Sequence, residues 1–200
     1  EAIEEQNLPS IGSTNNDQDN DGVDDNSDDY PTDPNKAFDQ YYPDAQNFAS
    51  LAFEDLWPAK GDYDFNDLVL DQQYRFITSA NNFISEMEIK LVVRHIGASY
   101  HNGFGISLPF TPSQVSTVSG YNITDGLVTL DGKGLETNQT QAVIIPFDDA
   151  SDNLGDTITI NIILATPFNL SQFNQTGANP FLFANATRGR EIHLTNMAPT

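Results

Sequence analysis

Between positions 83 and 94, apolar and charged residues alternate with a period of two. Phe83, Met87, Ile89, Leu91 and Val93 are apolar, and Glu86, Glu88, Lys90 and Arg94 are charged. Successive side chains of a β-strand point to opposite faces, so this period predicts a strand with one buried and one solvated face. An amphipathic helix would repeat about every 3.6 residues, and the stretch is a poor fit to that period.

Further short runs rich in β-branched or aromatic residues follow along the chain. They cover residues 104–110, 141–147, 157–165, 180–183 and 191–194. Turn-forming clusters such as Asp125-Gly126 and Asp131-Gly132 separate them, and this punctuation is typical of antiparallel sheets. We therefore predict an all-β fold, an antiparallel β-sandwich of jelly-roll or Greek-key style with little or no helix, preceded by an irregular N-terminal segment.

That segment contains an aspartate-rich loop with the spacing of a calcium site. Counting Asp17 as position 1, carboxylates stand at 1, 3, 5, 9 and 12, Gly22 at position 6 permits a sharp turn, and a backbone carbonyl is available at position 7. The predicted Ca²⁺ ligands are therefore Asp17, Asp19, Asp21, Val23 (carbonyl), Asp25 and Asp28. The alternative is a disordered acidic linker, although such linkers do not place glycine and the acids at these positions.

Prolines on both sides of the loop exclude the helix pair of an EF-hand. Pro9 precedes the loop, Pro31 and Pro34 follow it, and proline breaks helices. We expect three segments: residues 1–16 as an extended arm or disordered lead-in, residues 17–34 as the calcium-binding loop, and residues 35–200 as the β-sandwich domain.

The charge distribution limits the partners of the chain. Its formal net charge is −21, and 19 acidic against 2 basic residues lie before position 72. Without a basic patch the chain cannot displace counterions from phosphates, so nucleic acid is excluded as a partner. No cysteine is present. Runs of about 18 apolar residues, which a membrane span needs, do not occur.

A second acidic concentration lies between positions 51 and 71. Asp62, Asp64 and Asn66 repeat the 1, 3, 5 spacing, but Asp67 stands where the loop would need glycine. We predict a second calcium site built from two turns, with the ligands Glu54, Asp55, Asp62, Asp64 and Asp67. The alternative is that these acids shape turns and strand ends.

Aromatic residues accompany this second group. Trp57, Tyr63 and Tyr100 are candidates for a surface that stacks on sugar rings while calcium holds hydroxyl groups. The alternative for Trp57 is an ordinary core or loop anchor.

Residues 52–58 (AFEDLWP) and 61–69 (GDYDFNDLV) resemble the signature of the bacterial LruC domain family. Residues 99–105 (SYHNGFG) and 190–194 (REIHL) are also similar to that family, and the resemblance covers about residues 17–200. The aspartate loop itself resembles the helix-free calcium loops of thrombospondin type 3 repeats. These resemblances imply a secreted or surface-displayed bacterial domain with calcium sites and no established catalytic activity.

The residue pattern also favours a binding protein over an enzyme. A Gly-x-Ser-x-Gly motif is absent, and His95, His101 and His193 lack the paired spacing of a zinc site. Calcium loops of extracellular type bind at about 10⁻⁴ to 10⁻³ M, which fits an extracellular or cell-surface location.

We therefore expect a calcium-binding, extracellular structural or adhesive protein of a bacterial surface or matrix. The alternative is a calcium-dependent, lectin-like module that binds a glycan. LruC relatives continue past the position of Thr200, which leads to the expectation of an uncovered sheet edge. Residues 1–16 of another copy would add to this edge and build a filament or oligomer.

Overall fold

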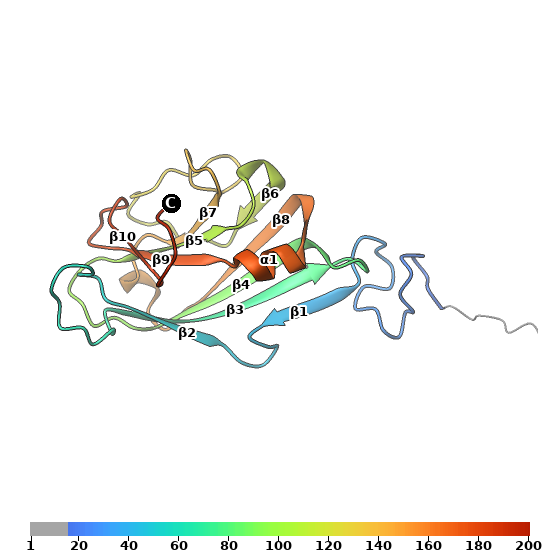
Figure 1. Cartoon of the computed structure of the whole chain (residues 1–200), viewed down its shortest axis with the longest axis horizontal. Helices are drawn as coiled ribbons and strands as arrows, with labels where there is room; N and C mark the ends of the chain where they lie inside the picture. The colour runs from blue at the N-terminus through green and yellow to red at the C-terminus, as the bar shows by residue number, and fades with distance from the viewer. Residues whose placement is uncertain (1–15) are drawn as a thin grey trace, which may run out of the picture.

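The computed structural model describes residues 16–200, which form two antiparallel sheets (Figure 1). The first sheet has the order β1-β3-β4-β8-β6, with β2 also paired to β3. Its strands are β1 (Phe38–Tyr42), β2 (Ala49–Phe53), β3 (Leu68–Thr78), β4 (Phe83–His95), β6 (Val115–Ser119) and β8 (Thr157–Asn169). The second sheet has the order β10-β9-β5-β7, with strands β5 (Gly103–Leu108), β7 (Ala142–Phe147), β9 (Asn179–Phe183) and β10 (Glu191–His193). The predicted all-β sandwich is confirmed.

The chain crosses from one sheet to the other at each connection between β4 and β9. Consecutive strands therefore face each other across the core, as in the predicted jelly-roll style. Phe104 of β5 illustrates the packing: its ring stacks on Phe147 at 5.8 Å and meets Phe53 of the first sheet edge-on at 6.1 Å. All three rings are buried.

The alternating stretch forms β4 as predicted. Met87, Ile89, Leu91 and Val93 are buried, whereas the charged residues between them are partly exposed. β4 lies between β3 and β8, so its apolar face meets the core while the other face carries ion pairs such as Lys36–Glu86 at 2.8 Å.

Two boundaries differ from the prediction by more than one residue. β5 ends at Leu108, because Pro109 and Pro112 cannot continue a strand ladder, and a short 3₁₀ helix, η1 (Pro112–Gln114), follows. β8 extends to Asn169, whose side chain accepts the N–H groups of Ser171 and Gln172 at 2.9 and 3.3 Å. This cap starts the short helix α1 (Leu170–Thr176), which the sequence pattern did not locate. A second short 3₁₀ helix is η2 (Ser151–Asn153).

β1 and β2 lie end to end along the same edge of β3. Tyr42 of β1 is paired with Tyr74, and Ala49 of β2 with Gln72. The aspartate loop leads into β1, and the second acidic segment follows β2. Figure 1 shows the two segments at opposite ends of the long axis, the first in blue at the right and the second in teal at the left. Among residues 16–200 no helix has the length and apolarity needed to cross a membrane.

Candidate metal sites

Backbone hydrogen bonds hold the aspartates of the first loop in place. Asp19, Asp21 and Asp28 each accept, through Oδ1, the N–H of the residue two positions later, at 3.2, 2.8 and 2.6 Å. Asp17 accepts two N–H groups further along the loop, at 2.7 and 3.1 Å. Aspartate favours such turns because its short side chain reaches the backbone ahead of it. One oxygen of Asp19, Asp21 and Asp28 therefore shapes the loop and the other is free for another role.

The remaining oxygens are buried. Among residues 16–200, Oδ2 of Asp19, Asp21 and Asp28 has no hydrogen-bond partner, and carboxylate oxygens of Asp17, Asp19 and Asp21 lie within 4.8 Å of one another. Burial raises the pKa of Asp19, and the neighbouring charges of Asp21, Asp28 and Asp17 raise it further. Unpaired carboxylates in such proximity repel each other, and a divalent cation between them removes the repulsion.

The other two predicted ligands have less direct roles. Asp25 accepts the Gln18 N–H at 2.8 Å, and its own N–H donates to the Asn16 carbonyl at 2.6 Å, which closes the loop. Position 9 of such loops often reaches the ion through a water molecule, which is compatible with this placement. The N–H of Val23 is held by Asp21, and the role of its carbonyl as a ligand stays a prediction.

The loop is anchored to the sandwich by a polar triad. The Tyr30 hydroxyl donates to Asp39 of β1 at 2.6 Å, and Arg75 of β3 donates to both Tyr30 and Asp39, at 2.9 and 2.6 Å. Asp29 adds two bonds: its N–H donates to the Ala37 carbonyl at 2.9 Å, and its carboxylate accepts the Asp39 N–H at 2.8 Å. The position of Asp28 is thereby coupled to the first sheet.

The second group gathers Glu54, Asp62 and Asp64. Ligand oxygens of the three lie within 4.8 Å of one another. Glu54 is 2 % exposed and its Oε2 has no hydrogen-bond partner in the described part of the chain, whereas Asp62 and Asp64 are exposed. Burial raises the pKa of Glu54, and the charges of Asp67, Asp62, Asp64 and Asp55 raise it further. The group thus combines a buried, unpaired carboxylate with two acids that face solvent.

Asp55 and Asp67, also predicted as ligands, are engaged in hydrogen bonds beside this group. Asp67 accepts the Asp55 N–H at 2.8 Å, and Asp55 accepts the Asn102 amide at 2.8 Å. Arg190 donates to the Asp55 carbonyl at 3.1 Å. These contacts fix the turn that presents Glu54, so the structure gives both aspartates a positioning role, and direct coordination by them stays a prediction.

Three aromatic rings project around the second group. Trp57 is 52 % exposed, Tyr63 46 % and Phe65 51 %, and the rings of Trp57 and Tyr63 meet edge-on at 6.4 Å. Trp57 is therefore not the core anchor of the alternative interpretation. Tyr63 and Phe65 have positive φ angles of 59° and 54°, which bulky residues adopt rarely. Sequence reasoning missed Phe65, whose exposure no local pattern indicated.

Tyr100 lies apart from these rings. Its half-buried ring has the Arg190 guanidinium 5.7 Å from the centroid, and it lines a shallow depression with Lys60, Asp62 and Glu54. The rings of Trp57 and Tyr63 therefore pack together, whereas Tyr100 lines a separate depression.

A third group joins His101, Asp125 and Asp149, which sequence reasoning did not single out. His101 is hydrogen-bonded to Asp149, whose other oxygen accepts the Ser151 N–H at 2.8 Å. The bond to Asp149 raises the pKa of His101. Because His101 and Asp149 are paired with each other, this group is a hydrogen-bonded cluster. Its members come from separate loops, so no local spacing signals it.

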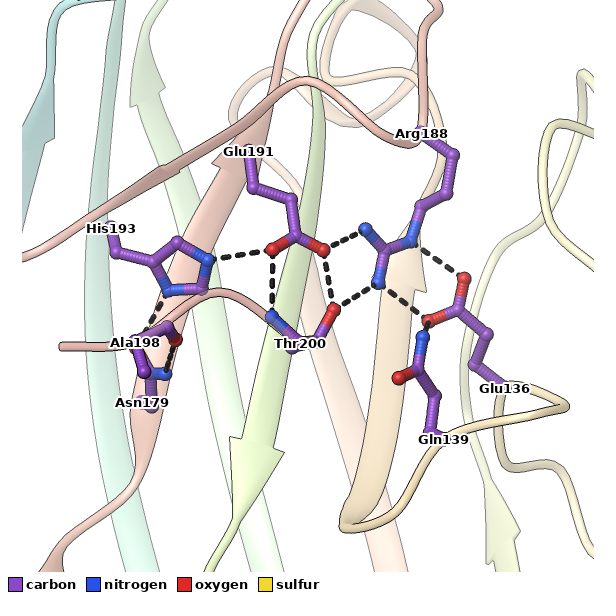
Figure 2. A network of polar contacts seen from close by, with 8 residues as sticks. All are labelled: Glu136, Gln139, Asn179, Arg188, Glu191, His193, Ala198 and Thr200. Atoms are coloured by element: carbon purple, nitrogen blue, oxygen red, sulfur yellow. Dashed lines mark hydrogen bonds and ion pairs between the residues drawn. The ribbon is translucent and has the colours of Figure 1, made fainter.

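A buried ion network supports the β9–β10 hairpin beside the second group (Figure 2). Arg188 donates to both oxygens of Glu136 at 2.6 Å and also contacts Glu191. Glu191 accepts from His193 and from the Thr200 N–H, both at 2.8 Å. Burial alone would raise the pKa of Glu191, but the bonds from Thr200, Arg188 and His193 outweigh it and lower this pKa to about 2.

Fold and sites together define an all-β sandwich domain with two clusters formed by carboxylates alone and no cysteine. The chain belongs to the family described as a domain of unknown function (DUF4842), which matches residues 82–200. No curated protein and no solved structure matches the chain. The matched region begins just before β4, so it includes Asn102 and Arg190 but neither Asp17–Asp28 nor Glu54–Asp64.

Proposed function

We propose that the chain is a calcium-binding domain with a structural or adhesive role at a bacterial surface or in an extracellular matrix. One observation carries the proposal: carboxylate oxygens of Asp17, Asp19 and Asp21 lie within 4.8 Å of one another, and Oδ2 of Asp19, Asp21 and Asp28 is buried without a hydrogen-bond partner among residues 16–200. The resemblance to the LruC domain family and to thrombospondin type 3 loops supports the location.

The chemistry of the donors favours calcium among the common ions. Carboxylate oxygens alone form the two groups, whereas zinc prefers cysteine and histidine ligands. Magnesium requires a near-octahedral shell with several waters, while calcium accepts about six to eight oxygens in irregular geometry. A loop that offers several carboxylates suits the larger ion.

The proposed role is non-catalytic. The triad of Tyr30, Asp39 and Arg75 links the loop to β1 and β3, so calcium in the loop would stabilise the edge of the first sheet. Self-association through residues 1–16 is a further part of the proposal, and residues 1–15 of this arm lie outside the described part of the chain.

Replacing Asp17 and Asp21 by Asn tests the first site. At millimolar calcium and an affinity of about 10⁻⁴ to 10⁻³ M, calcium should stabilise the folded state by roughly 0.4 to 1.4 kcal/mol per site. We expect the double variant to lose this increment at the first site, as measured by denaturant unfolding with calcium and with a chelator. The matched control is Asp24→Asn, because Asp24 makes a local turn outside the group. Equal calcium stabilisation in wild type and double variant would contradict the proposal.

A further inference from the structure

The exposed rings of Trp57 and Phe65 border a groove that shares Glu54 with the second metal group. The groove has a volume of about 520 Å³ and is lined by Trp57, Phe65, Glu54 and, opposite them, Thr195, Asn196 and Met197. Small-ligand sites commonly span about 300 to 1,000 Å³. Its walls combine half-exposed ring faces with exposed hydroxyl and amide groups, which is a surface for a ligand with both apolar and hydrogen-bonding faces.

The second metal group leaves coordination positions open on the solvent side. Glu54, Asp62 and Asp64 each offer an oxygen to it, and Oδ2 of Asp64 accepts the Asn66 amide. Calcium takes about six to eight oxygens, so about three or more positions are available to water or to a ligand. Glu54 belongs to both the group and the groove, and therefore brings these positions next to the rings.

The local charge selects the kind of ligand. Five carboxylates surround the site, Lys60 and Arg190 lie beside it, and one calcium leaves a net charge of about −1. A phosphate headgroup or an acidic sugar would be repelled by this residual charge. A purely apolar partner would leave the open calcium positions without ligands. Neutral hydroxyl groups meet both requirements.

We propose that this groove binds a neutral glycan, with neighbouring hydroxyls on the calcium ion held by Glu54, Asp62 and Asp64 and a sugar ring on Trp57 and Phe65. The proposal rests on calcium binding at the second group. The opposite wall is preorganised, because β10 is held by the Arg188 network through Glu191 and His193 (Figure 2). Thr195 and Asn196 then offer hydrogen bonds to further hydroxyls.

A glycan array and calorimetry test the proposal on the full chain. The labelled protein is applied, with calcium and with a chelator, to an array of neutral and acidic glycans, and the strongest neutral oligosaccharide is titrated into wild type and variants. Trp57 is the sole tryptophan, so its emission reports occupancy of the groove. We expect calcium-dependent binding of neutral glycans, abolished in Asp62→Asn/Asp64→Asn.

Two single variants separate the rings from the metal. Phe65→Ala should weaken glycan binding about tenfold while calcium binding is kept, because the variant lacks the half-exposed ring that the sugar covers. Asn196→Ala should also weaken glycan binding, because it removes a hydrogen-bonding amide from the opposite wall of the groove. Phe83→Ala removes an exposed ring at the start of β4 and should leave glycan binding unchanged.

The outcomes distinguish this inference from the calcium proposal. If calorimetry shows that Asp62→Asn/Asp64→Asn removes a calcium site but no neutral glycan binds, the glycan inference is overturned and the calcium proposal stands. If that variant binds as many calcium ions as wild type, the calcium proposal at the second group and the glycan inference are both overturned. Preferential binding of acidic glycans, or of vesicles that contain phosphatidylserine, also overturns the inference.

Discussion

Glu54 is a buried carboxylate with an unpaired oxygen, and Gly61 determines how closely the loop approaches it. A methyl group on Gly61 would collide with Oε1 of Glu54. We expect Gly61→Ala to displace this ligand and weaken calcium at the second site about tenfold or more, as loss of supporting contacts does at metal sites. Calcium calorimetry measures the effect.

The matched control is Gly132→Ala, since a methyl group there meets no atom within 4 Å. It should leave both calcium sites unchanged. Wild-type affinity at the second site in Gly61→Ala would show that Glu54 is not a ligand.

Glu191 makes the stability of the domain depend on pH. Its pKa is lowered to about 2 in the folded state, below the usual value of 4.5, so its stabilisation is present above about pH 4.5 and is lost as the pH falls toward 2. The difference corresponds to roughly 3 kcal/mol at neutral pH. In Glu191→Gln, denaturant unfolding at pH 7 and pH 3 should differ less than in wild type. An identical pH dependence in the two proteins would contradict this assignment.

At the scale of structural elements, side-chain hydrogen bonds link the aspartate loop to β1. The Tyr30 hydroxyl joins Asp39 and Arg75, and Tyr30→Phe removes both bonds while it keeps the ring. Hydrogen bonds to charged groups contribute about 1.5 to 3 kcal/mol when buried, and this partly exposed one should contribute about 1 kcal/mol.

Limited proteolysis in calcium should therefore cut residues 16–37 faster in Tyr30→Phe. Tyr121→Phe, which changes an exposed ring between β6 and β7, is the control and should be cut like wild type. Equal cleavage of Tyr30→Phe and wild type would show that the loop is held by other contacts.

At the scale of the whole molecule, the two acidic segments proposed to bind calcium lie at opposite ends of the long axis (Figure 1). Distant sites without shared contacts change stability additively, within about 0.5 kcal/mol. We expect the losses of calcium stabilisation in Asp17→Asn/Asp21→Asn and Asp62→Asn/Asp64→Asn to add in the combined variant. Unfolding in a fixed calcium concentration tests this, and a clearly smaller combined loss would mean that the sites communicate through the sheet.

The sequence alone predicted the features that depend on local spacing. The alternation in β4 follows from the geometry of one strand, and the aspartates of the first loop converge because turns of two residues repeat along it. The same reasoning predicted five ligands in the connection between β2 and β3: Glu54, Asp55, Asp62, Asp64 and Asp67. The structure gathers Glu54, Asp62 and Asp64, and engages Asp55 and Asp67 in hydrogen bonds beside them.

Contacts between distant segments were decided by the tertiary structure. Asn102 reaches Asp55 across 47 positions and Arg190 reaches it across 135, and no local pattern encodes either contact. The groove exists because sheet pairing places β10 and residues 194–197 opposite Trp57 and Phe65. A periodic pattern predicts which face of a strand is buried. Which segment packs on that face depends on the packing energy of the whole core, and that energy is summed over residues far apart in the chain.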